Sequence, residues 1–313
     1  MHILYLSRSS SGKPHPFVQE QVQALVGNFN IHVKHHLIER GGLTGYLKTI
    51  TQLIKHLKYN KTDIIHVHYG LWGLAAIISR ALTLTKIPVI ITFHGSDINK
   101  STERQLSLLA HRFSAYNIIV SDKMQKYFKK DFAVLPCGID TDVELIHRER
   151  TRVEKGWSEN DFVVLFASNF KRKEKDPEFA FNVIENFSRQ TDKKVKFIEL
   201  AGYTRDELTC LMQAADTLLL CSEREGSPQV LKEAILNSLP IVANDVGDVK
   251  SICADTDNCF IVPKKVEAYT KILLFLSQNP LRIQHRDNVL NRFDNKIISQ
   301  RLYDIYKQVL DSN

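Results

Sequence analysis

The sequence predicts an α/β protein with two successive domains, each a parallel sheet covered by helices. Apolar segments of strand length alternate with segments of helical periodicity in both halves of the chain, and this order builds parallel sheets. A highly charged stretch, residues 140–160, interrupts the alternation, which starts again at Phe162. With 313 residues and 43% hydrophobic side chains, the chain is long and apolar enough for two soluble globular domains.

In the first half, the expected strands span residues 2–7, 30–39, 63–68, 88–93 and 117–120. The expected helices span 16–26, 46–59 and 71–82, followed by one that runs through Arg112. Pro16 suits the first turn of its helix, where the missing N–H costs nothing. In the helix 46–59, one buried stripe is predicted from the spacing of Leu47, Ile50, Ile54 and Leu57.

The second half alternates in the same way. Its expected strands span residues 162–166, 195–200 and 217–221, with a further strand after Pro240. Its expected helices span 177–187, 205–214, 266–277, 281–293 and 297–310.

Residues 222–234 connect an apolar strand to a helix and contain two carboxylates. Ser227 is a natural N-cap and Pro228 suits the first turn, so we expect the helix to start there. The free N–H groups and positive dipole end of such a helix suit a phosphate or a polar sugar face. Glu225 lies just before the helix and Glu233 lies inside it, and both can accept hydrogen bonds from sugar or ribose hydroxyls.

Positive charge is concentrated in the first half of the chain. Residues 1–147 carry 17 Lys and Arg against 10 Asp and Glu, and 11 of the 12 His, whereas the remainder has 25 of each sign. This asymmetry predicts an anionic partner for the first half. We expect a membrane face or a lipid-diphosphate acceptor, and no nucleic acid. Residues 46–59 and 123–130 are the candidate membrane contacts, although the first could equally be a helix packed on its own sheet with a wet basic face.

Cysteine usage and hydropathy favour a cytoplasmic protein. The five Cys are odd in number and have no C-x-x-C spacing, which indicates reduced thiols and neither a disulfide framework nor a metal site. No apolar run reaches the length of a membrane span. Polar Ser7 and Arg8 follow the apolar start directly, so no signal peptide is expected. We expect the protein to lie in the cytoplasm, peripherally at the inner face of the cell membrane.

The string 222–248 resembles retaining glycosyltransferase family 4, the group 1 glycosyltransferases of the GT-B fold. Two Glu at this spacing are common by themselves. The match becomes specific because Gly226 follows the first Glu, Ala234 follows the second, and Asn-Ser-Leu-Pro-Ile-Val-Ala-Asn-Asp-Val-Gly-Asp continues it over 237–248. Leu-Pro-Cys-Gly-Ile-Asp at 135–140 is similar to the family's interdomain Pro-Asn-Gly-Val-Asp, with Cys137 in place of Asn.

The resemblance implies two Rossmann-like domains facing across a cleft, with the last helix crossing back to the first domain. We therefore expect an acceptor-binding domain over residues 1–147 and a nucleotide-sugar-binding domain over 148–296. Residues 297–313 would form the returning helix. The similarity is tighter in the second half than in the first.

A run of cations, within residues 168–176, stands between a strand and a helix. Cations at a strand end can clamp a phosphate, and the alternative is a solvated charged loop. Many family members carry an Arg and a Lys five residues apart here. This chain has Phe170 at the first position, and the nearest match is Arg172 with Lys175. We expect Lys175 and Arg172 to neutralise the diphosphate of the donor.

His94 ends a strand just before Gly95, which lets the backbone approach a ligand closely. A lone His is more often structural, but the resemblance implies that His94 faces the donor sugar. We expect Asp97 to help hold this loop. His66 and His68 share one face of the preceding strand. They are interpreted as core residues or as residues that support the site from behind, since no third ligand is placed to make a zinc site.

The remaining expected donor contacts lie in three turns. They are Gly226, Ser227, Gln229 and Val230 at the helix mouth, Gly12 in the first strand–helix turn, and Tyr203 and Thr204 after the strand 195–200. The first turn usually holds a Gly pair in the family, whereas Gly12 stands alone here, beside Ser10 and Ser11.

The resemblance implies a retaining hexosyltransferase that uses a nucleotide-sugar donor, UDP-sugar being expected, and no cofactor. The acceptor would be lipid-linked or a polysaccharide precursor, as in lipopolysaccharide or capsule synthesis. Glu225, His94, Lys175 and Arg172 are the catalytic candidates, and Glu233 would grip the ribose. The departing phosphate would take the acceptor proton during front-face attack.

Three alternatives remain open. Two D-x-D strings, 140–142 and 255–257, are typical of metal-using transferases, but the first lies in the linker and the second in a turn, so no metal is expected. The chain could instead be another GT-B enzyme, such as a nucleotide-sugar epimerase or phosphorylase. It could also be a nucleotide-sugar-binding protein without turnover.

Overall fold

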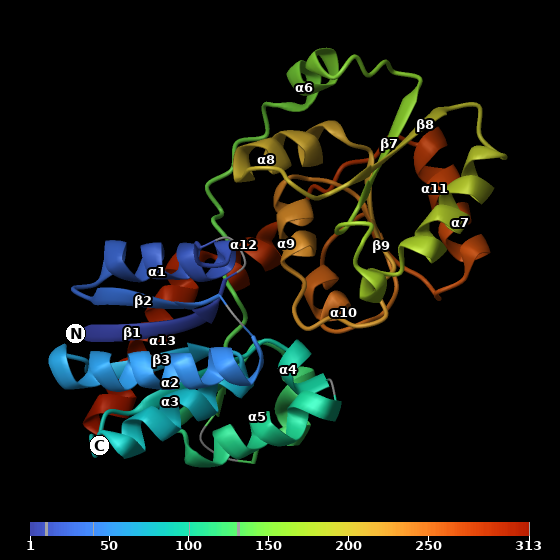
Figure 1. Cartoon of the computed structure of the whole chain (residues 1–313). Helices are drawn as coiled ribbons and strands as arrows, with labels where there is room; N and C mark the ends of the chain where they lie inside the picture. Colours follow the sequence, from blue (N-terminus) through green and yellow to red (C-terminus); the bar gives the residue numbers. More distant parts are fainter. Residues whose placement is uncertain (10–11, 40, 100, 130–131, 313) are drawn as a thin grey trace. The chain divides into compact units, whose positions relative to one another are not determined.

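The computed structural model describes residues 1–9, 12–39, 41–99, 101–129 and 132–312, and the chain divides into two compact units (Figure 1). The first unit comprises Met1–Asp140 and Phe293–Asn313, and the second comprises Thr141–Arg292. Each unit is a parallel sheet with helices on its faces, so the predicted α/β architecture is confirmed.

The first unit contains a six-stranded sheet in the order β2-β1-β3-β4-β5-β6, and all its strand pairs are parallel. The strands are β1 (His2–Arg8), β2 (His32–Ile38), β3 (Ile64–His68), β4 (Val89–Phe93), β5 (Tyr116–Ile119) and β6 (Phe132–Val134). The helices are α1 (Pro16–Asn28), α2 (Gly42–Tyr59), α3 (Gly70–Leu82), α4 (Ser96–Asn99), α5 (Ser101–Phe113), the 3-10 helix η1 (Asp122–Tyr127) and α13 (Asn295–Asp311).

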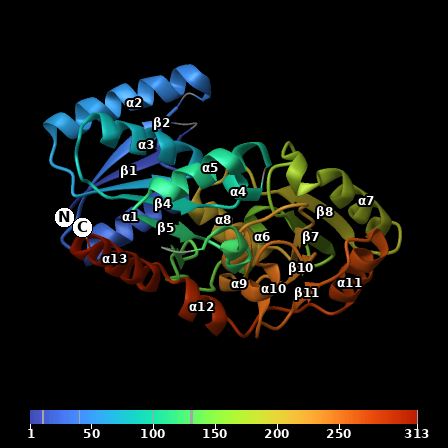
Figure 2. The same cartoon turned by 90° about the horizontal axis from the view of Figure 1, so that it is seen from below.

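Alternation along the strands gives this sheet two apolar faces. In β1, Leu4 and Leu6 belong to one buried cluster and Ile3 and Tyr5 to the other. Helices α2 and α3 cover the first face, and α1 and α13 cover the second (Figure 2). The last helix of the chain thus packs on the sheet formed by its first half, as the resemblance implied. Burial of each large apolar side chain contributes roughly 1.5–3 kcal/mol to stability.

The chain returns to the first unit beside residues 135–140. Ile139 donates its N–H to Phe293 O at 2.8 Å and accepts from Asn295 N at 2.9 Å. Gly138 packs closely against Asn295, because a Cβ there would lie 3.1 Å from Asn295 Cα and 2.3 Å from its Oδ1, which would have to move.

The second unit contains a five-stranded parallel sheet in the order β11-β10-β9-β7-β8. The strands are β7 (Asp161–Phe166), β8 (Lys194–Glu199), β9 (Thr217–Leu220), β10 (Ile241–Ala243) and β11 (Cys259–Ile261). The helices are α6 (Arg148–Glu154), the 3-10 helix η2 (Lys173–Lys175), α7 (Pro177–Ser188), α8 (Arg205–Ala214), α9 (Gln229–Leu236), α10 (Val249–Cys253), α11 (Val266–Gln278) and α12 (Asp287–Phe293).

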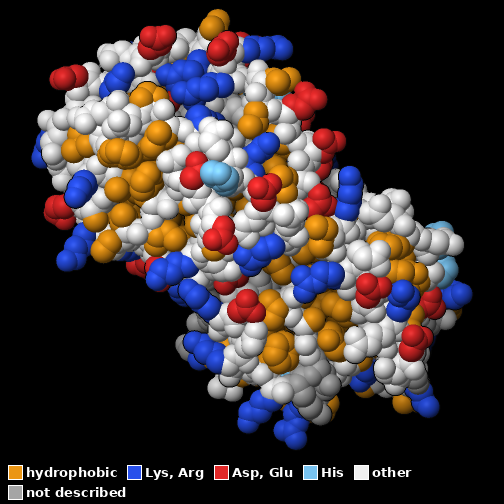
Figure 3. Space-filling view, turned by 180° about the vertical axis from the view of Figure 1, so that it is seen from behind, with side chains coloured by type: hydrophobic (Ala, Val, Ile, Leu, Met, Phe, Trp, Pro, Cys, Tyr) orange, Lys and Arg blue, Asp and Glu red, His pale blue; other side chains and the backbone are white. Residues whose placement is uncertain are grey.

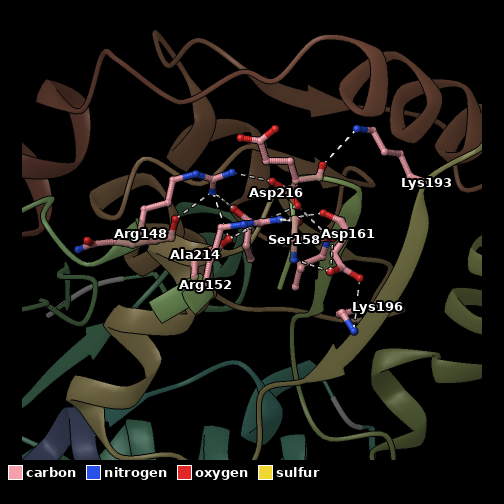
Figure 4. A network of polar contacts seen from close by, with 12 residues as sticks. Arg148, Arg152, Ser158, Asp161, Lys193, Lys196, Ala214 and Asp216 are labelled. Atoms are coloured by element: carbon pink, nitrogen blue, oxygen red, sulfur yellow. Dashed lines mark hydrogen bonds and ion pairs between the residues drawn. The ribbon is translucent and has the colours of Figure 1, made fainter. Parts of the chain in front are cut away.

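Charged residues of the stretch 140–160 anchor α6 to the second unit (Figure 4). Arg148 and Arg152 contact the Asp216 carboxylate at 2.8 and 3.3 Å. Asp216 Oδ2 also accepts the N–H of Val163, so the network ties α6 to the starts of β7 and β9.

The surface opposite the view of Figure 1 has no single character. Its Lys and Arg side chains are interspersed with acidic and apolar ones (Figure 3).

Three local predictions were wrong. Leu47 is 55% exposed, and the buried side of α2 runs through Ile50, Leu53 and Leu57. Helix α12 begins at Asp287, six residues after the expected start at 281. The Met and Phe side chains in 123–130 do not form an exposed surface, because Met124 and Phe128 are buried in the core. Lys130 lies outside the described residues.

Candidate active site

The second unit brings Lys175 and Glu225 into direct contact. Lys175 Nζ lies 2.5 Å from Glu225 Oε1, and the two side chains are only 10% and 9% exposed. Ser222 Oγ donates to the same oxygen at 2.6 Å. The other carboxylate oxygen of Glu225 has no hydrogen-bond partner within the described part of the chain. One oxygen is therefore held by the protein, and the second can accept a hydrogen bond from a ligand.

Sheet topology explains why these residues meet. Lys175 lies in η2, which follows β7, and Glu225 follows β9, and these two strands are neighbours in the sheet. Loops at the carboxyl ends of adjacent parallel strands lie side by side. The Glu223 N–H donates to Glu174 O at 3.0 Å, and the Cys221 thiol donates to Lys175 O at 3.4 Å.

The loop after β9 also packs closely against Gly247. The N–H of Asp248 donates to Gly226 O at 2.9 Å. Gly247 has φ +53°, and a Cβ there would lie 2.5 Å from Gly226 O and 2.8 Å from the Glu225 carbonyl carbon. Only glycine satisfies both the backbone angle and the close approach.

Helix α9 starts one residue later than expected. Pro228 is its N-cap residue, and Gln229 and Val230 form its first turn. Ser227 does not cap the helix, and its buried hydroxyl has no partner among the described residues. The expectation of a Ser227 N-cap was therefore wrong. The first-turn N–H groups of α9 still lack helical partners, as in any α-helix, and only Gly226, Ser227 and Pro228 separate the helix from Glu225.

Glu233 has a partner that was not expected. Arg205, the first residue of α8, donates to Glu233 Oε1, and the two side chains are 42% and 18% exposed. Thr204 caps α8 by accepting from Glu207 N and donating to the Glu207 carboxylate, so its hydroxyl has a structural role. Tyr203 precedes this cap and is half-buried.

Arg172 does not join Lys175. Its guanidinium contacts Glu174 at 2.8 Å, and its side chain is 55% exposed. Phe170, which stands where the family pattern has a cation, stacks on Phe166 with ring centroids 5.1 Å apart. The aromatic side chain thus extends the core toward the loop.

In the first unit, Asp97 ties together the ends of β3 and β4. Its Oδ1 accepts from the N–H groups of His94 and Gly95 at 3.1 and 3.0 Å, and its Oδ2 accepts from Gly70 N at 2.8 Å. Burial raises the pKa of Asp97 to about 6. This carboxylate fixes the backbone at His94, as expected.

The imidazole of His94 has neighbours at both ring nitrogens. Nε2 lies 2.9 Å from His68 Nδ1, and Nδ1 lies 3.8 Å from Cys137 Sγ. Tyr69 packs on the ring and has φ +75°, a left-handed backbone that is uncommon for a bulky residue. Burial lowers the pKa of His94 to about 3, so its imidazole is neutral at physiological pH.

His66 and His68 are fully buried and stacked, which confirms their interpretation as core residues. Gly12 is exposed and has φ +73°, as a glycine turn permits. Ser10 and Ser11 lie outside the described residues. Gly12 and His94 belong to the first unit, and the other candidate residues belong to the second.

Two family models match this chain. The Glycosyltransferase Family 4 model matches residues 4–143, and the Glycosyl transferases group 1 model matches residues 180–279. The chain belongs to the family 4, or group 1, glycosyltransferases. In the described part of this family 4 chain, no helix is long and apolar enough to cross a bilayer.

Curated relatives of this family 4 chain include two bacterial glycosyltransferases. The putative teichuronic acid biosynthesis glycosyltransferase TuaC of Bacillus subtilis is 26% identical over 237 residues, which are 67% of this chain and 60% of that protein. The Escherichia coli UDP-Gal:alpha-D-GlcNAc-diphosphoundecaprenol alpha-1,3-galactosyltransferase is 24% identical over 310 residues, 83% of this chain and 79% of that protein. The chain thus spans less than two thirds of the length of TuaC.

Solved structures show that this family 4 chain has the GT-B fold. Sucrose-phosphate synthase from Thermosynechococcus elongatus has a TM-score of 0.76 at 15% identity and covers 100% of both chains. Anabaena HepE in complex with UDP-glucose has a TM-score of 0.71 at 17% identity and covers 98% of this chain and 100% of that one.

Several contacts at the site were not predicted from the sequence. Ser222 lies three residues before Glu225 in the same segment, and this spacing could have indicated that the serine hydroxyl donates to the carboxylate. The Arg205–Glu233 pair had no such signal, because it depends on how α8 lies beside α9. The close approach at Gly247 likewise depends on tertiary packing.

Proposed function

We propose that this protein is a retaining glycosyltransferase that moves a hexose from a nucleotide-diphosphate donor to a lipid-linked or polysaccharide-precursor acceptor. The observation that carries the proposal is the buried Lys175–Glu225 pair with one open carboxylate oxygen. It offers a hydroxyl acceptor and a cation at the same strand ends, next to the first turn of α9. UDP is the favoured nucleotide because HepE was solved with UDP-glucose and the E. coli relative is named for UDP-Gal.

In the proposed reaction, the bond between the sugar C1 and the β-phosphate oxygen breaks as the acceptor oxygen bonds C1 on the same face. The departing phosphate takes the acceptor proton. Lys175 and the N–H groups at the start of α9 would stabilise the charge that develops on the diphosphate, and such preorganised electrostatics is usually the largest catalytic contribution. Because these groups supply counter-charge, the proposed reaction needs no metal. Arg172 would assist only after releasing Glu174.

The remaining roles concern the sugar and the nucleoside. We assign the sugar hydroxyls to the open oxygen of Glu225 and to His94, and the ribose to Glu233. Gly226, Gln229 and Val230 would contact the phosphates through their backbones. Gly12, Tyr203, Thr204 and Ser227 remain proposed donor contacts, with Thr204 acting through its backbone because its hydroxyl caps α8.

We further propose that the first unit contacts the acceptor and an anionic membrane surface at the cytoplasmic face. Helix α2 supports this, because Gly42–Tyr59 contains three Lys and no Asp or Glu, and its Leu43 and Leu47 are 75% and 55% exposed. An apolar side chain beside cations favours an anionic bilayer.

A donor screen followed by a transfer assay tests the function. UDP-sugars that raise the melting temperature of the full chain identify the donor, because a ligand that binds the native state stabilises it. The labelled donor is then offered to a sugar-diphosphate-polyprenol acceptor, with and without EDTA, and the anomeric configuration of the product is read by NMR. We expect transfer with retention and no loss in EDTA. Sugar release or epimerisation without acceptor would instead indicate another GT-B enzyme, and binding without turnover would indicate a non-catalytic protein.

A further inference from the structure

A buried chain of hydrogen bonds links the returning helix α13 to the centre of the first sheet. The hydroxyl of Tyr306 lies 2.6 Å from the Tyr5 hydroxyl and 2.5 Å from His66 Nδ1. His66 Nε2 lies 2.7 Å from Thr92 Oγ1. All four side chains are at least 97% buried, so these hydrogen bonds are shielded from water.

Three contacts join these four side chains, so the directions of the bonds depend on one another. Within the described residues, the Tyr5 hydroxyl has only Tyr306 as a partner, and Thr92 Oγ1 has only His66. The neutral His66 ring is held at both nitrogens, by Tyr306 at Nδ1 and by Thr92 at Nε2.

His68 continues this arrangement toward His94. Its ring stacks on His66 with centroids 4.8 Å apart, and Tyr5 packs against both rings at 4.7 and 5.4 Å. His68 Nδ1 lies 2.9 Å from His94 Nε2, whereas its buried Nε2 has no partner among the described residues. Buried N–H groups without acceptors are rare, so the single proton of His68 lies on Nδ1 and is donated to His94.

This donation determines the proton position on His94. Since Nε2 accepts, the neutral imidazole carries its proton on Nδ1, which lies 3.8 Å from the thiol of Cys137. Sulfur is a weak acceptor, so a ligand oxygen can take its place. An Asn at position 137 would accept this hydrogen bond more strongly through its amide oxygen than the Cys137 sulfur does.

We propose that His68 is a positioning residue that holds His94 as the Nδ1–H tautomer, a neutral hydrogen-bond donor for an oxygen of the donor sugar. The Tyr306–His66 chain and the Tyr5 ring keep His68 in place. The role of His94 in binding the sugar rests on the proposed function, whereas the assignment of its tautomer does not.

Nitrogen NMR of histidine-labelled protein tests the tautomer without any substrate. The His94 signals are assigned by their loss in His94→Gln. We expect Nδ1 to have the chemical shift of a protonated ring nitrogen and Nε2 that of an unprotonated one. The reverse pattern in the wild-type protein overturns the proposal, whether or not the protein transfers sugar.

Two variants of His68 separate positioning from packing. His68→Asn places an amide N–H near the former Nδ1, whereas His68→Leu fills the space without a donor. We expect His68→Leu to lose the Nδ1–H pattern of His94 and to lower kcat at least about tenfold, with the KM for donor less affected, since about 1.4 kcal/mol of transition-state stabilisation is tenfold in rate. We expect His68→Asn to retain the pattern and most of kcat.

The control is His32→Leu, which removes an exposed histidine of the same domain. It should leave both the His94 signals and kcat unchanged. If folded His68→Leu keeps the Nδ1–H pattern of His94, or if His68→Asn is as impaired as His68→Leu, the role of His68 is packing alone.

Discussion

The ammonium of Lys175 and the carboxylate of Glu225 lie 2.5 Å apart, and about nine tenths of each side chain is buried. Fifty residues separate them in the sequence, and their loops follow neighbouring strands of one sheet. The pair places a cation beside a carboxylate whose other oxygen has no hydrogen-bond partner among the described residues. It also makes the two residues energetically dependent on one another.

A double-mutant cycle on this pair is expected to show strong coupling. Lys175→Met leaves the Glu225 carboxylate with only Ser222 as a donor, and breaking a buried pair in this way costs about 3 kcal/mol. The double variant Lys175→Met with Glu225→Gln removes the unpaired charge and should recover at least about 1 kcal/mol relative to the sum of the singles. The free energy of unfolding in urea, measured for the wild-type protein, the two single variants and the double variant, gives both the cost and the recovery. Additivity within about 0.5 kcal/mol would mean that the contact is energetically neutral.

The close approach at Gly247 predicts a large effect of a single methyl group. Gly247→Ala incurs both a positive-φ penalty and a clash with the backbone at Glu225 and Gly226. Gly202→Ala is the matched control, because Gly202 has φ +80° and nothing within 4 Å of its Cβ position. We expect the control to cost about 1 kcal/mol and Gly247→Ala at least twice as much, with reduced donor binding. Equal melting temperatures for the two variants would contradict the packing described for this loop.

Buried histidines predict a loss of stability in mild acid. Burial lowers the pKa of His66 and His94 to about 3 and that of His68 well below its ordinary value. As pH falls below about 6.5, these histidines therefore become protonated in the unfolded chain while they stay neutral in the folded protein, and this favours unfolding. Their stabilisation is complete above pH 6.5 and is lost as pH falls toward 3. It amounts to roughly 2 kcal/mol per histidine between pH 6.5 and 5.

Asp97 acts in the opposite direction. Burial raises its pKa to about 6, so its contribution is present below about pH 4 and is lost as pH rises through 6. Urea unfolding at pH 7 and pH 5 measures the balance, and we expect the histidines to dominate. His66→Phe should reduce the pH dependence. A wild-type stability that is the same at both pH values would show that these histidines are not held neutral.

Arg205 is expected to affect donor binding more than stability. Its contact with Glu233 is partly exposed, so Arg205→Ala should cost less than about 1 kcal/mol of stability. If Glu233 binds the ribose, loss of the arginine that orients it should raise the KM for donor several-fold and change kcat less. Arg189→Ala, which removes an exposed pair with Glu185, is the control and should change neither. An unchanged KM in Arg205→Ala would remove Arg205 from the donor site.

The sequence predicted the sheets and helices well because hydrophobic periodicity reflects burial directly. Helix α8 has the expected bounds, 205–214, and most strands end within two residues of the expected positions. Periodicity does not show how far a neighbouring element extends, and this is why Leu47 of α2 is exposed although its spacing matches the buried stripe.

The candidate site was predictable only in part. Lys175 and Glu225 could be placed at strand ends by sequence pattern, but their contact depends on β7 and β9 being neighbours. The contacts of Arg205 with Glu233 and of His94 with Cys137 join segments that no local pattern relates. Pro228 is the N-cap where Ser227 was expected, because both residues suit a helix start and the local sequence does not choose between them.

The most direct test of the central claim compares two glutamates of one loop. Glu223 is exposed, whereas Glu225 holds Lys175 and keeps one oxygen open. The measurement is kcat/KM for transfer of labelled sugar from the donor identified in the screen, for Glu225→Gln, Glu223→Gln and the wild-type protein. We expect a loss of at least about a hundredfold, or about 2.7 kcal/mol of transition-state stabilisation, for Glu225→Gln and less than threefold for Glu223→Gln. Near-wild-type transfer by folded Glu225→Gln would contradict it.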